Sequence, residues 1–321
     1  MTDHDENTAD VLDVVVIGGG AAGLSGALTL VRQRRSTVVV DAGAPRNAPA
    51  AGVHGLLALD GTPPAELVAR GRAEVEGYGG RVVDDRVVSV AHVEAGFEVT
   101  LAEGAPLVAR RLLVASGLVD DLPDVPGVAE RWGRDVIHCP FCHGWESRDR
   151  RIGVLAASPM SVHQALMMRQ LSDDVRFFAH GVELSEDDRA TLDALGVPVF
   201  DGAVERLEIE DDAIRGVRLA HGAVVEVDVV AVGTRLHARA DFLAGIGLEP
   251  VEHMMGTMVP ADATGRTPVP GVWVAGNATD LMAQVSGAAA DAARVAAQIH
   301  GDLLMTDLQV TLAARGGKVS A

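Results

Sequence analysis

The sequence predicts an α/β protein with two Rossmann-like domains of three ββα layers, and three segments of the chain support this. Residues 11–32 combine a β-branched apolar strand, a glycine-rich turn and a helix, and residues 151–171 repeat that order without the glycines. Residues 270–300 supply a third apolar strand, another glycine turn and a helix of small residues. Because this third segment completes the first domain after the second has ended, we expect the first domain to be discontinuous.

The turn after the first strand has the GxGxxG spacing of a dinucleotide-binding site. Gly18 permits the tight turn, Gly20 lets a pyrophosphate approach the backbone, and Gly23 lets the helix pack closely against the strand. The phosphates would bind at the helix N-terminus, beside Ala21 and Ala22. Strand, turn and helix occur in the order that such a site requires.

An acidic residue and a long loop follow this turn. The strand 37–40 ends at Asp41, which is placed to accept hydrogen bonds from an adenosine ribose. The segment 44–62 is rich in Gly, Pro and Ala, which suits a loop lying over a bound ligand. His54 and Asp60 lie in this loop, where such side chains more often make local hydrogen bonds than act as catalysts.

The other elements are predicted from alternation and from apolar runs. In the first domain we expect a helix at 64–78 and a small antiparallel sheet of strands at 81–93, 97–102 and 107–114. In the second we expect strands at 175–179, 197–200, 204–209, 216–220 and 223–232 and a helix at 186–195. A connector with two prolines at 122–127 marks a domain boundary, and the tail from Met305 has no predicted structure.

The composition excludes several kinds of partner. The formal net charge of -18 repels nucleic acid and anionic membranes, and aromatic residues, at 3%, leave few rings for stacking on bases. The first ten residues are acidic and lack the features of a secretory signal, and no apolar run is long enough to span a membrane. We therefore expect a soluble, cytoplasmic protein.

Cys139 and Cys142 are the only cysteines of the chain and lie two residues apart, in the sequence Cys-Pro-Phe-Cys-His. Two thiolates at this spacing can close a small disulfide ring and exchange two electrons. His138 and His143 would complete a Cys2His2 set, but four ligands within six residues are far more crowded than zinc sites. A purely structural bridge over so short a loop would remove little unfolded-state entropy. We therefore favour a redox-active pair and expect no metal.

Taken together, these motifs resemble the low-molecular-weight thioredoxin reductase family of two-domain FAD flavoproteins. The resemblance covers nearly the whole chain and adds the strand end 115–117 and the run 271–276, Gly-Val-Trp-Val-Ala-Gly. It implies an FAD-binding domain at 1–118 and 235–321 and an inserted central domain at 119–234, which carries the CxxC motif and a degenerate NAD(P)H-type fold. It also implies a homodimer.

The same resemblance implies which residues hold FAD. The family normally has an aspartate after the run 271–276, which hydrogen-bonds the flavin ribityl chain, and Asn277 stands there in this sequence. Besides the glycine turn and Asp41, the expected FAD contacts come from four separate places in the chain. They are Ala42, Arg46, His54, Ala115, Gly117, Gly276, Asn277, Gln284 and Val285.

Three departures from the reductases bear on function. The second glycine turn, for NADPH, is replaced by residues 156–159, Ala-Ala-Ser-Pro, whose side chains stand where phosphate should approach the backbone. No arginine cluster for a 2′-phosphate follows His180, because residues 181–184 are Gly-Val-Glu-Leu. The acid that usually follows the second cysteine is His143, and an imidazole can accept a proton at neutral pH.

These departures make the chain more similar to the flavin-dependent dithiol oxidases of the gliotoxin and holomycin kind. By that similarity a substrate dithiol attacks the disulfide at Cys139, while Cys142 is the cysteine closer to the flavin. His143, with His138 as a weaker candidate, manages the protons. Oxygen is the expected electron acceptor, so that hydrogen peroxide is formed.

Two other functions remain open at this point. One is an NADPH-dependent thioredoxin-disulfide reductase whose cofactor site has diverged, or a related reductase that takes electrons from another donor such as ferredoxin. The other is a flavin-bound redox sensor that uses the cysteine pair as a switch. The sequence does not distinguish a small dithiol from a thioredoxin-like protein as the substrate.

Overall fold

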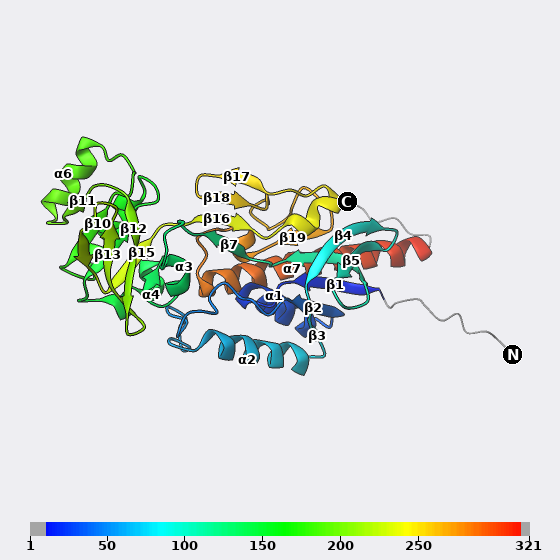
Figure 1. Cartoon of the computed structure of the whole chain (residues 1–321). Coiled ribbons are helices and arrows are strands. Elements are labelled where there is room, and N and C mark those ends of the chain that lie inside the picture. The colour runs from blue at the N-terminus through cyan, green and yellow to red at the C-terminus, as the bar shows by residue number, and fades with distance from the viewer. Residues whose placement is uncertain (1–10, 316–321) are drawn as a thin grey trace. The chain divides into compact units, whose positions relative to one another are not determined.

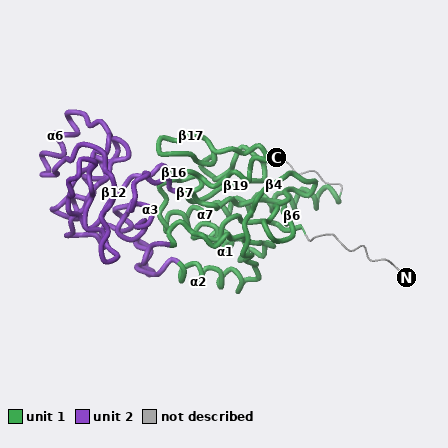
Figure 2. The backbone as a smooth tube through the Cα atoms, in the orientation of Figure 1, with its two compact units in different colours: residues 1–48, 65–119, 236–321 green, residues 49–64, 120–235 purple. Residues whose placement is uncertain are grey.

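The computed structural model describes residues 11–315 and divides the chain into two compact units (Figures 1 and 2). Unit 1 holds the chain up to residue 48, residues 65–119 and the chain from residue 236, and unit 2 holds residues 49–64 and 120–235. The loop segment 49–64, expected in the first domain, thus groups with unit 2. The assignment of the units as FAD-binding and central domains stays a prediction.

Unit 1 is built on one seven-stranded sheet, in the order β3-β2-β1-β6-β5-β4 with β19 also paired to β6. The strands are β1 Leu12–Ile17, β2 Thr37–Asp41, β3 Arg81–Asp84, β4 Val87–Val93, β5 Gly96–Leu101, β6 Leu107–Val114 and β19 Val272–Val274. β1, β2, β3, β6 and β19 pair in parallel, whereas β4, β5 and β6 pair in antiparallel. The predicted α/β fold class is confirmed.

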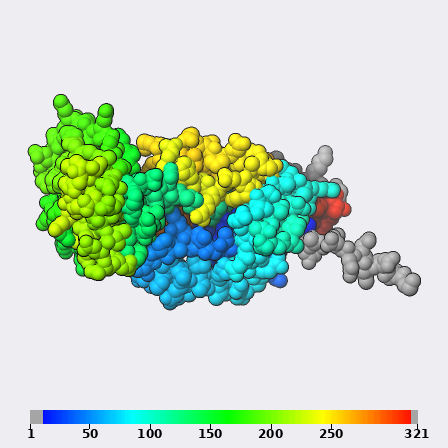
Figure 3. Space-filling view, viewed as in Figure 1, coloured from blue at the N-terminus to red at the C-terminus, as the bar shows by residue number. Residues whose placement is uncertain are grey.

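The prediction of a separate small antiparallel sheet is wrong, because the run 81–93 forms two strands, β3 and β4. The carboxylate of Asp85 accepts backbone N–H groups of Arg86 at 2.6 Å and Gly104 at 2.8 Å, and this turn ends β3. β3 then joins the parallel part of the sheet, while β4 and β5 extend the same sheet as a hairpin. This hairpin forms part of the surface of unit 1 (cyan in Figure 3).

The sheet of unit 1 has an apolar core on each face, because successive side chains of β1 point to opposite sides. Val14 and Val16 pack with the helices, and Val15 and Ile17 pack with β4, β5 and the 3-10 helix η2. The helical elements are α1 Ala21–Arg32, α2 Pro64–Gly77, η2 Asp241–Ile246, η3 Gly276–Ala278 and α7 Val285–Ala314. The result is a β layer, a sheet and a helical layer, as the ββα prediction requires.

Helix α7 is longer than the predicted 284–300 and includes most of the tail from Met305. Leu303 is buried in the helical core, and Asp307 pairs with Arg35 at 2.8 Å and also with Arg110. These contacts tie the last turns of α7 to the sheet. Residues 305–314 are therefore part of a helix that packs on unit 1, which their weak apolar pattern did not indicate.

A four-stranded sheet lies where the chain passes between the units. Its order is β17-β18-β16-β7. The strands are β7 Leu118–Asp121, β16 Arg235–Ala238, β17 Val251–His253 and β18 Gly256–Met258. For its longer segment in unit 2, the chain leaves unit 1 within β7 and returns within β16, so both of these crossings have extended backbone.

Unit 2 repeats the three-layer plan around a parallel sheet of order β11-β10-β9-β15-β8. Its strands are β8 Val136–Ile137, β9 Ile152–Leu155, β10 Val175–Phe178, β11 Val199–Phe200 and β15 Val229–Val232. An antiparallel sheet of β12 Val204–Glu210, β13 Ala213–Leu219 and β14 Val224–Glu226 covers one face through Leu155 and Phe178. The predicted single strand 223–232 is wrong, because β14 belongs to this second sheet and β15 to the parallel one.

Helices cover the other face of the unit 2 sheet, where Val154 and Phe177 are buried. α5 Ser161–Arg169 and α6 Glu186–Ala194 contribute to this core, whereas Val128 of α3 Val128–Arg131 packs on the opposite face. The other helical elements of unit 2 are α4 Pro140–His143 and η1 Trp145–Ser147. The short helices α3, α4 and η1 are too short to give a periodic pattern and were not predicted. Among residues 11–315, no helix has the length and apolar character that a membrane span requires.

Candidate functional site

The expected FAD-binding residues of unit 1 gather at one edge of its sheet. Gly18 follows β1, Ala115 follows β6, Ala275 follows β19, and Asp41 ends β2. These four strands run parallel, so their carboxyl ends share one edge. Open α/β sheets bind their ligands at that edge. The fold thus brings together motifs that lie more than 250 residues apart in the chain.

Close packing requires glycine at two positions of the glycine-rich turn. At a third position the glycine leaves room for a ligand. Gly18 has φ of +110°, and a Cβ there would lie 2.3 Å from the Ala115 carbonyl oxygen. A Cβ on Gly23 would lie 1.8 Å from the Gly18 carbonyl oxygen. By contrast, a Cβ on Gly20 would meet no atom within 4 Å. Gly20 therefore faces open space, into which a pyrophosphate can fit.

Two helices begin at this edge without acidic residues in their first turns. Gly20 is the N-cap of α1 and Gln284 is the N-cap of α7, and neither helix has a side-chain cap. Gly276 lies between the two helix starts, because a Cβ there would lie 2.8 Å from the Cβ of Ala22 in α1 and 3.5 Å from the Cβ of Ala288 in α7. Val285 begins α7. Uncapped helix N-termini of this kind attract anions such as phosphates.

Asp41 is buried at the end of β2 and its carboxylate has fixed partners. Arg72 donates a hydrogen bond to it at 2.7 Å, and the Gly43 N–H donates another at 3.2 Å. Asp41 retains acceptor capacity for a ribose, because a carboxylate has about four lone-pair sites. Ala42 is exposed and Arg46 is half-buried in the following loop. Their contact with FAD stays a prediction.

The strand end after β6 also offers room for a ligand. Gly117 has φ of +70°, and a Cβ there would meet no atom within 4 Å. The turn is held by its neighbour Ser116, whose hydroxyl donates to the Arg239 carbonyl oxygen at 2.6 Å. Ala115 is buried and packs in the helical core. The turn is therefore fixed while its glycine remains open.

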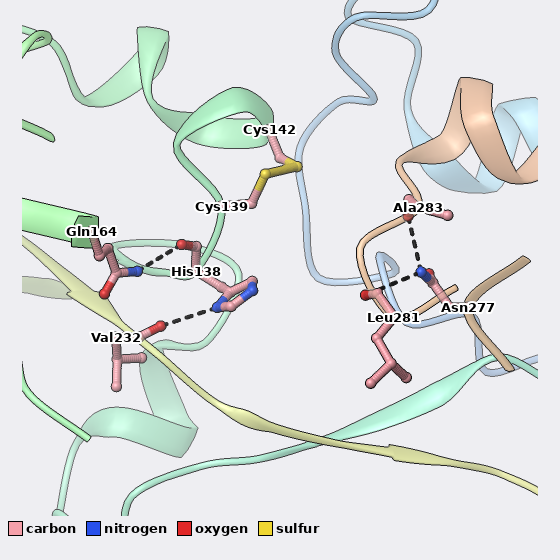
Figure 4. The surroundings of a disulfide bond; sticks show 8 residues. All are labelled: His138, Cys139, Cys142, Gln164, Val232, Asn277, Leu281 and Ala283. Carbon is pink, nitrogen blue, oxygen red and sulfur yellow. Dashed lines mark hydrogen bonds between the residues drawn. A yellow bond between two sulfur atoms is a disulfide. The ribbon is translucent and has the colours of Figure 1, made fainter. Parts of the chain in front are cut away.

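Asn277 has a role that the sequence did not indicate (Figure 4). Its amide nitrogen donates to the backbone carbonyl oxygens of Asp280 and Ala283, both at 2.9 Å, and lies 3.4 Å from that of Leu281. Figure 4 draws the contacts with Leu281 and Ala283. An aspartate has no proton to donate to these carbonyls at neutral pH. Asn277 thus holds the turn that leads into α7 through its amide nitrogen, and the contact of its amide oxygen with FAD stays a prediction.

Changing Asn277 to Asp is therefore expected to weaken FAD binding, although aspartate is the usual residue in similar enzymes. The substitution places a negative charge against carbonyl oxygens and removes two hydrogen bonds, which costs about 1–3 kcal/mol. We expect roughly tenfold weaker binding of FAD to the apoprotein, measured by flavin fluorescence titration. Gln170→Glu makes the same chemical change at the exposed end of α5 and should leave binding unchanged. Unchanged binding in Asn277→Asp would contradict this role.

The redox centre lies in unit 2, where β8 leads into the short helix α4 (Figure 4). Cys139 is the N-cap of α4 and Cys142 lies within it, with Cα atoms 5.2 Å apart, and the two form a disulfide. The Cys142 N–H donates to the Cys139 carbonyl oxygen at 3.2 Å. Pro140 at the first helical position fixes this turn. The predicted disulfide is confirmed, and both cysteines are half-buried.

His143 follows the second cysteine and is neutral at pH 7. Burial lowers its pKa from the ordinary 6.5, the charge of Glu146 opposes that shift, and His54 adds a small lowering effect. Its Nε2 atom is buried and has no hydrogen-bond partner among the described residues. Ser147 donates to the His143 carbonyl oxygen at 3.0 Å and fixes the backbone. The imidazole is therefore available to accept a proton.

Both the ring and the backbone carbonyl of His138 have hydrogen-bond partners. Its Nδ1 atom lies 3.2 Å from the Val232 carbonyl oxygen, and its own carbonyl oxygen accepts a hydrogen bond from Gln164 at 2.8 Å (Figure 4). Gln164 is buried in α5. These bonds position the peptide just before Cys139. Gln164 is thus a site residue that the sequence did not reveal, since nothing in its spacing marks it.

In unit 2, residues 156–161 correspond to a nucleotide-binding turn. Several backbone N–H groups of this turn are already hydrogen-bonded to other groups of the same turn. The Ser161 hydroxyl accepts the Ala157 N–H at 3.1 Å and the Ser158 N–H at 3.5 Å. The first amides of α5 are also used, because Ser161 N–H donates to Ser158 and Val162 N–H to Pro159. A phosphate at this turn would have to displace these bonds.

His180 is likewise occupied within unit 2. Its Nδ1 atom accepts the Val204 N–H at 2.9 Å, and burial lowers its pKa. The arginines of the neighbouring strand and helix are paired with acids, in the pairs Arg176–Asp174 and Arg189–Asp201. Both arginines therefore already have a carboxylate partner, and a 2′-phosphate would have to compete with it.

A family model described as pyridine nucleotide-disulphide oxidoreductase matches residues 12–292. The chain belongs to this family. It is 30% identical to thioredoxin reductase tcpT of Claviceps purpurea (strain 20.1), over 94% of this chain and 97% of that protein. The crystal structure of HlmI matches with a TM-score of 0.90 and 44% identity over 98% of each chain. An oxidoreductase from Agrobacterium tumefaciens matches with a TM-score of 0.87 and 35% identity, over 92% of this chain and 99% of that one.

The pyridine nucleotide-disulphide oxidoreductases related to this chain are FAD-binding flavoproteins, and FAD is its cofactor. The residues at the sheet edge of unit 1 fit that group, through the open positions at Gly20 and Gly117 and the two uncapped helices. The chain is thus a flavin-dependent disulfide oxidoreductase with a thioredoxin reductase-like fold. Which individual residues contact FAD stays a prediction.

One of the expected FAD contacts, His54, belongs to unit 2 of this oxidoreductase. Its Nδ1 atom lies 3.5 Å from a carboxylate oxygen of Asp60, and its Nε2 atom lies 3.5 Å from one of Glu146. The Gly55 N–H donates to Asp60 at 2.9 Å and holds the loop closed. His54 thus stands near the redox centre by its contacts within unit 2.

Proposed function

We propose that this oxidoreductase oxidises a dithiol to a disulfide through the Cys139–Cys142 pair and FAD, with oxygen as the final acceptor and without NAD(P)H. The observation that carries the proposal is the closed turn at Ser161, whose hydroxyl takes the backbone N–H groups that a pyrophosphate would need. The lack of an arginine cluster in residues 181–184, directly after His180, supports it further. A reductase has to bind NADPH at this place, whereas an oxidase does not.

The chemistry at the disulfide follows from thiol–disulfide exchange. A substrate thiolate attacks Cys139, the S–S bond breaks, and Cys142 leaves as a thiolate. The second substrate thiolate then attacks the substrate sulfur of the mixed disulfide and releases Cys139. The neutral His143 accepts a proton as the substrate thiol is deprotonated. FAD, when bound, takes up two electrons and passes them to oxygen.

The second candidate is an NADPH-dependent thioredoxin reductase, because the relative tcpT is named a thioredoxin reductase. An oxygen electrode separates the two functions. With 1,4-dithiothreitol and air, we expect oxygen uptake with about one peroxide per dithiol, and no uptake or thioredoxin reduction with NADPH. NADPH-driven reduction of a thioredoxin at a higher rate than dithiol oxidation would support the second candidate instead.

A further inference from the structure

The histidine of the 49–64 segment lies between two carboxylates. Asp60 faces Nδ1 of His54 and Glu146 faces Nε2, each at 3.5 Å. An imidazolium carries a proton on both ring nitrogens, so this arrangement suits a histidine that takes up and releases protons. Asp60 is exposed, and the Gly55 N–H lowers the pKa of its carboxyl, so that it stays ionised at the surface.

His54, Glu146 and His143 also line one pocket of about 520 Å³ within unit 2. His143 interacts electrostatically with both Glu146 and His54, and its Nε2 atom is buried without a hydrogen-bond partner among the described residues. Glu146 lies in η1, three residues after His143, which places it on the same face of the helical turn. The pocket brings residues from two distant segments of the chain to one place.

We propose that Glu146 and His54 form a proton-release path that carries protons from His143 to the surface at Asp60. The proposal rests on the proposed function, since only dithiol oxidation generates protons at this centre. It also gives the 49–64 segment a function within unit 2. Glu146 and His54 are then positioning and proton-transfer residues that act through His143.

The proton balance of the reaction gives such a path a use. When both cysteines leave as thiolates, oxidation of one dithiol places two electrons on Cys139 and Cys142 and releases the two protons of the substrate thiols. His143 can hold only one of them at Nε2, so it passes the first on before it accepts the second. Nε2 has no hydrogen-bond partner among the described residues, so the exposed Glu146 side chain takes the proton after turning toward it or through a pocket water, and hands it to His54, which releases it beside Asp60. Formation of hydrogen peroxide from oxygen later consumes two protons, so the complete reaction is proton-neutral.

The other charged groups of the pocket are committed to ion pairs and hydrogen bonds. Arg131 pairs with Asp135 and Asp212, both at 2.6 Å, and Arg134 also pairs with Asp212. Arg150 donates to a backbone carbonyl oxygen at 3.0 Å. None of the arginines can relay a proton at neutral pH. Of the side chains that line this pocket, His54, Glu146 and His143 are those suited to move one.

The test is anaerobic bleaching of the flavin by 1,4-dithiothreitol in a stopped-flow instrument, from pH 6 to pH 9.5. At pH 7 we expect Glu146→Gln and His54→Gln to slow bleaching on the order of tenfold, less than the roughly 10²–10⁴-fold effect of a direct proton acceptor. Near pH 9.5 the rates should converge, because thiols with a pKa of about 8.5 are already ionised. Glu183→Gln and His221→Gln are matched controls at exposed positions of unit 2 and should match wild type throughout.

Two results would overturn the proton path. One is a wild-type rate at pH 7 in both variants, and the other is a loss by the same factor at every pH, which a purely structural role would give. If dithiothreitol does not bleach the flavin of the wild-type protein, the proposed function is wrong and the proton path is wrong with it. If it bleaches the wild-type flavin normally and both variants match wild type, only the proton path is wrong.

Discussion

Replacing Cys142 with serine is expected to abolish dithiol oxidation, with a loss on the order of 10³-fold or more. Serine cannot form the Cys139–Cys142 disulfide, so the substrate thiolate has no sulfur–sulfur bond to break. Oxygen uptake with dithiothreitol measures the loss. The flavin spectrum is the internal control, because the FAD residues of unit 1 are unchanged and the variant should remain fully yellow. Turnover at the wild-type rate would contradict the role of the pair.

The matching variant Cys139→Ser tests which cysteine serves which partner. If Cys142 is the cysteine closer to the flavin, its free thiolate in Cys139→Ser should give a long-wavelength charge-transfer band that Cys142→Ser lacks. The band should disappear as the thiolate is protonated at low pH. The reverse pattern, with the band only in Cys142→Ser, would exchange the two assignments while keeping the disulfide chemistry.

Changing Gly23 to alanine is expected to cost about 3 kcal/mol or more of folding stability and most of the bound FAD. The added Cβ would lie 1.8 Å from the Gly18 carbonyl oxygen, so α1 and the glycine turn have to separate. Thermal unfolding and the ratio of FAD to protein measure the two effects. The helix start, on which the phosphates depend, moves together with the turn.

Gly301→Ala is the control for this prediction. Gly301 lies within α7, away from the helix start, and a Cβ there would meet no atom within 4 Å. Alanine favours a helix over glycine by up to about 1 kcal/mol, so this variant should be as stable as wild type or slightly more stable. Equal FAD content and equal melting temperature in Gly23→Ala and Gly301→Ala would contradict the role of the close contact at Gly23.

The fold was predictable where a single pattern fixes an element. The run 11–23 predicted a strand, a tight turn and a helix, because a β-branched run followed by GxGxxG has few other solutions. The break at Asp85 was not predictable, since apolar residues continue on both sides and one carboxylate ends the strand. The helix α4 around Pro140 is a single turn, which is shorter than any periodic pattern can reveal.

The site was predictable in its chemistry but not in its supporting contacts. Cys139 and Cys142 could be found from their spacing alone, because their reactivity depends on two sulfur atoms that a short sequence separation already brings together. Asn277 and Ser161 bind backbone groups, and no sequence pattern reports which carbonyls or amides a side chain will meet. His54 was assigned to FAD from resemblance, and its contact with Glu146 depends on a fold that joins residues 92 positions apart.

The central claim is that a dithiol, and not NADPH, reduces this flavoprotein. The most direct measurement is an anaerobic titration of the yellow protein with dithiothreitol, NADPH or NADH, following the oxidised flavin band. We expect dithiothreitol to bleach the band and air to restore it with peroxide, while neither nicotinamide changes it, because Ser161 closes the second nucleotide turn. Rapid bleaching by NADPH would contradict this account and would make the protein a reductase.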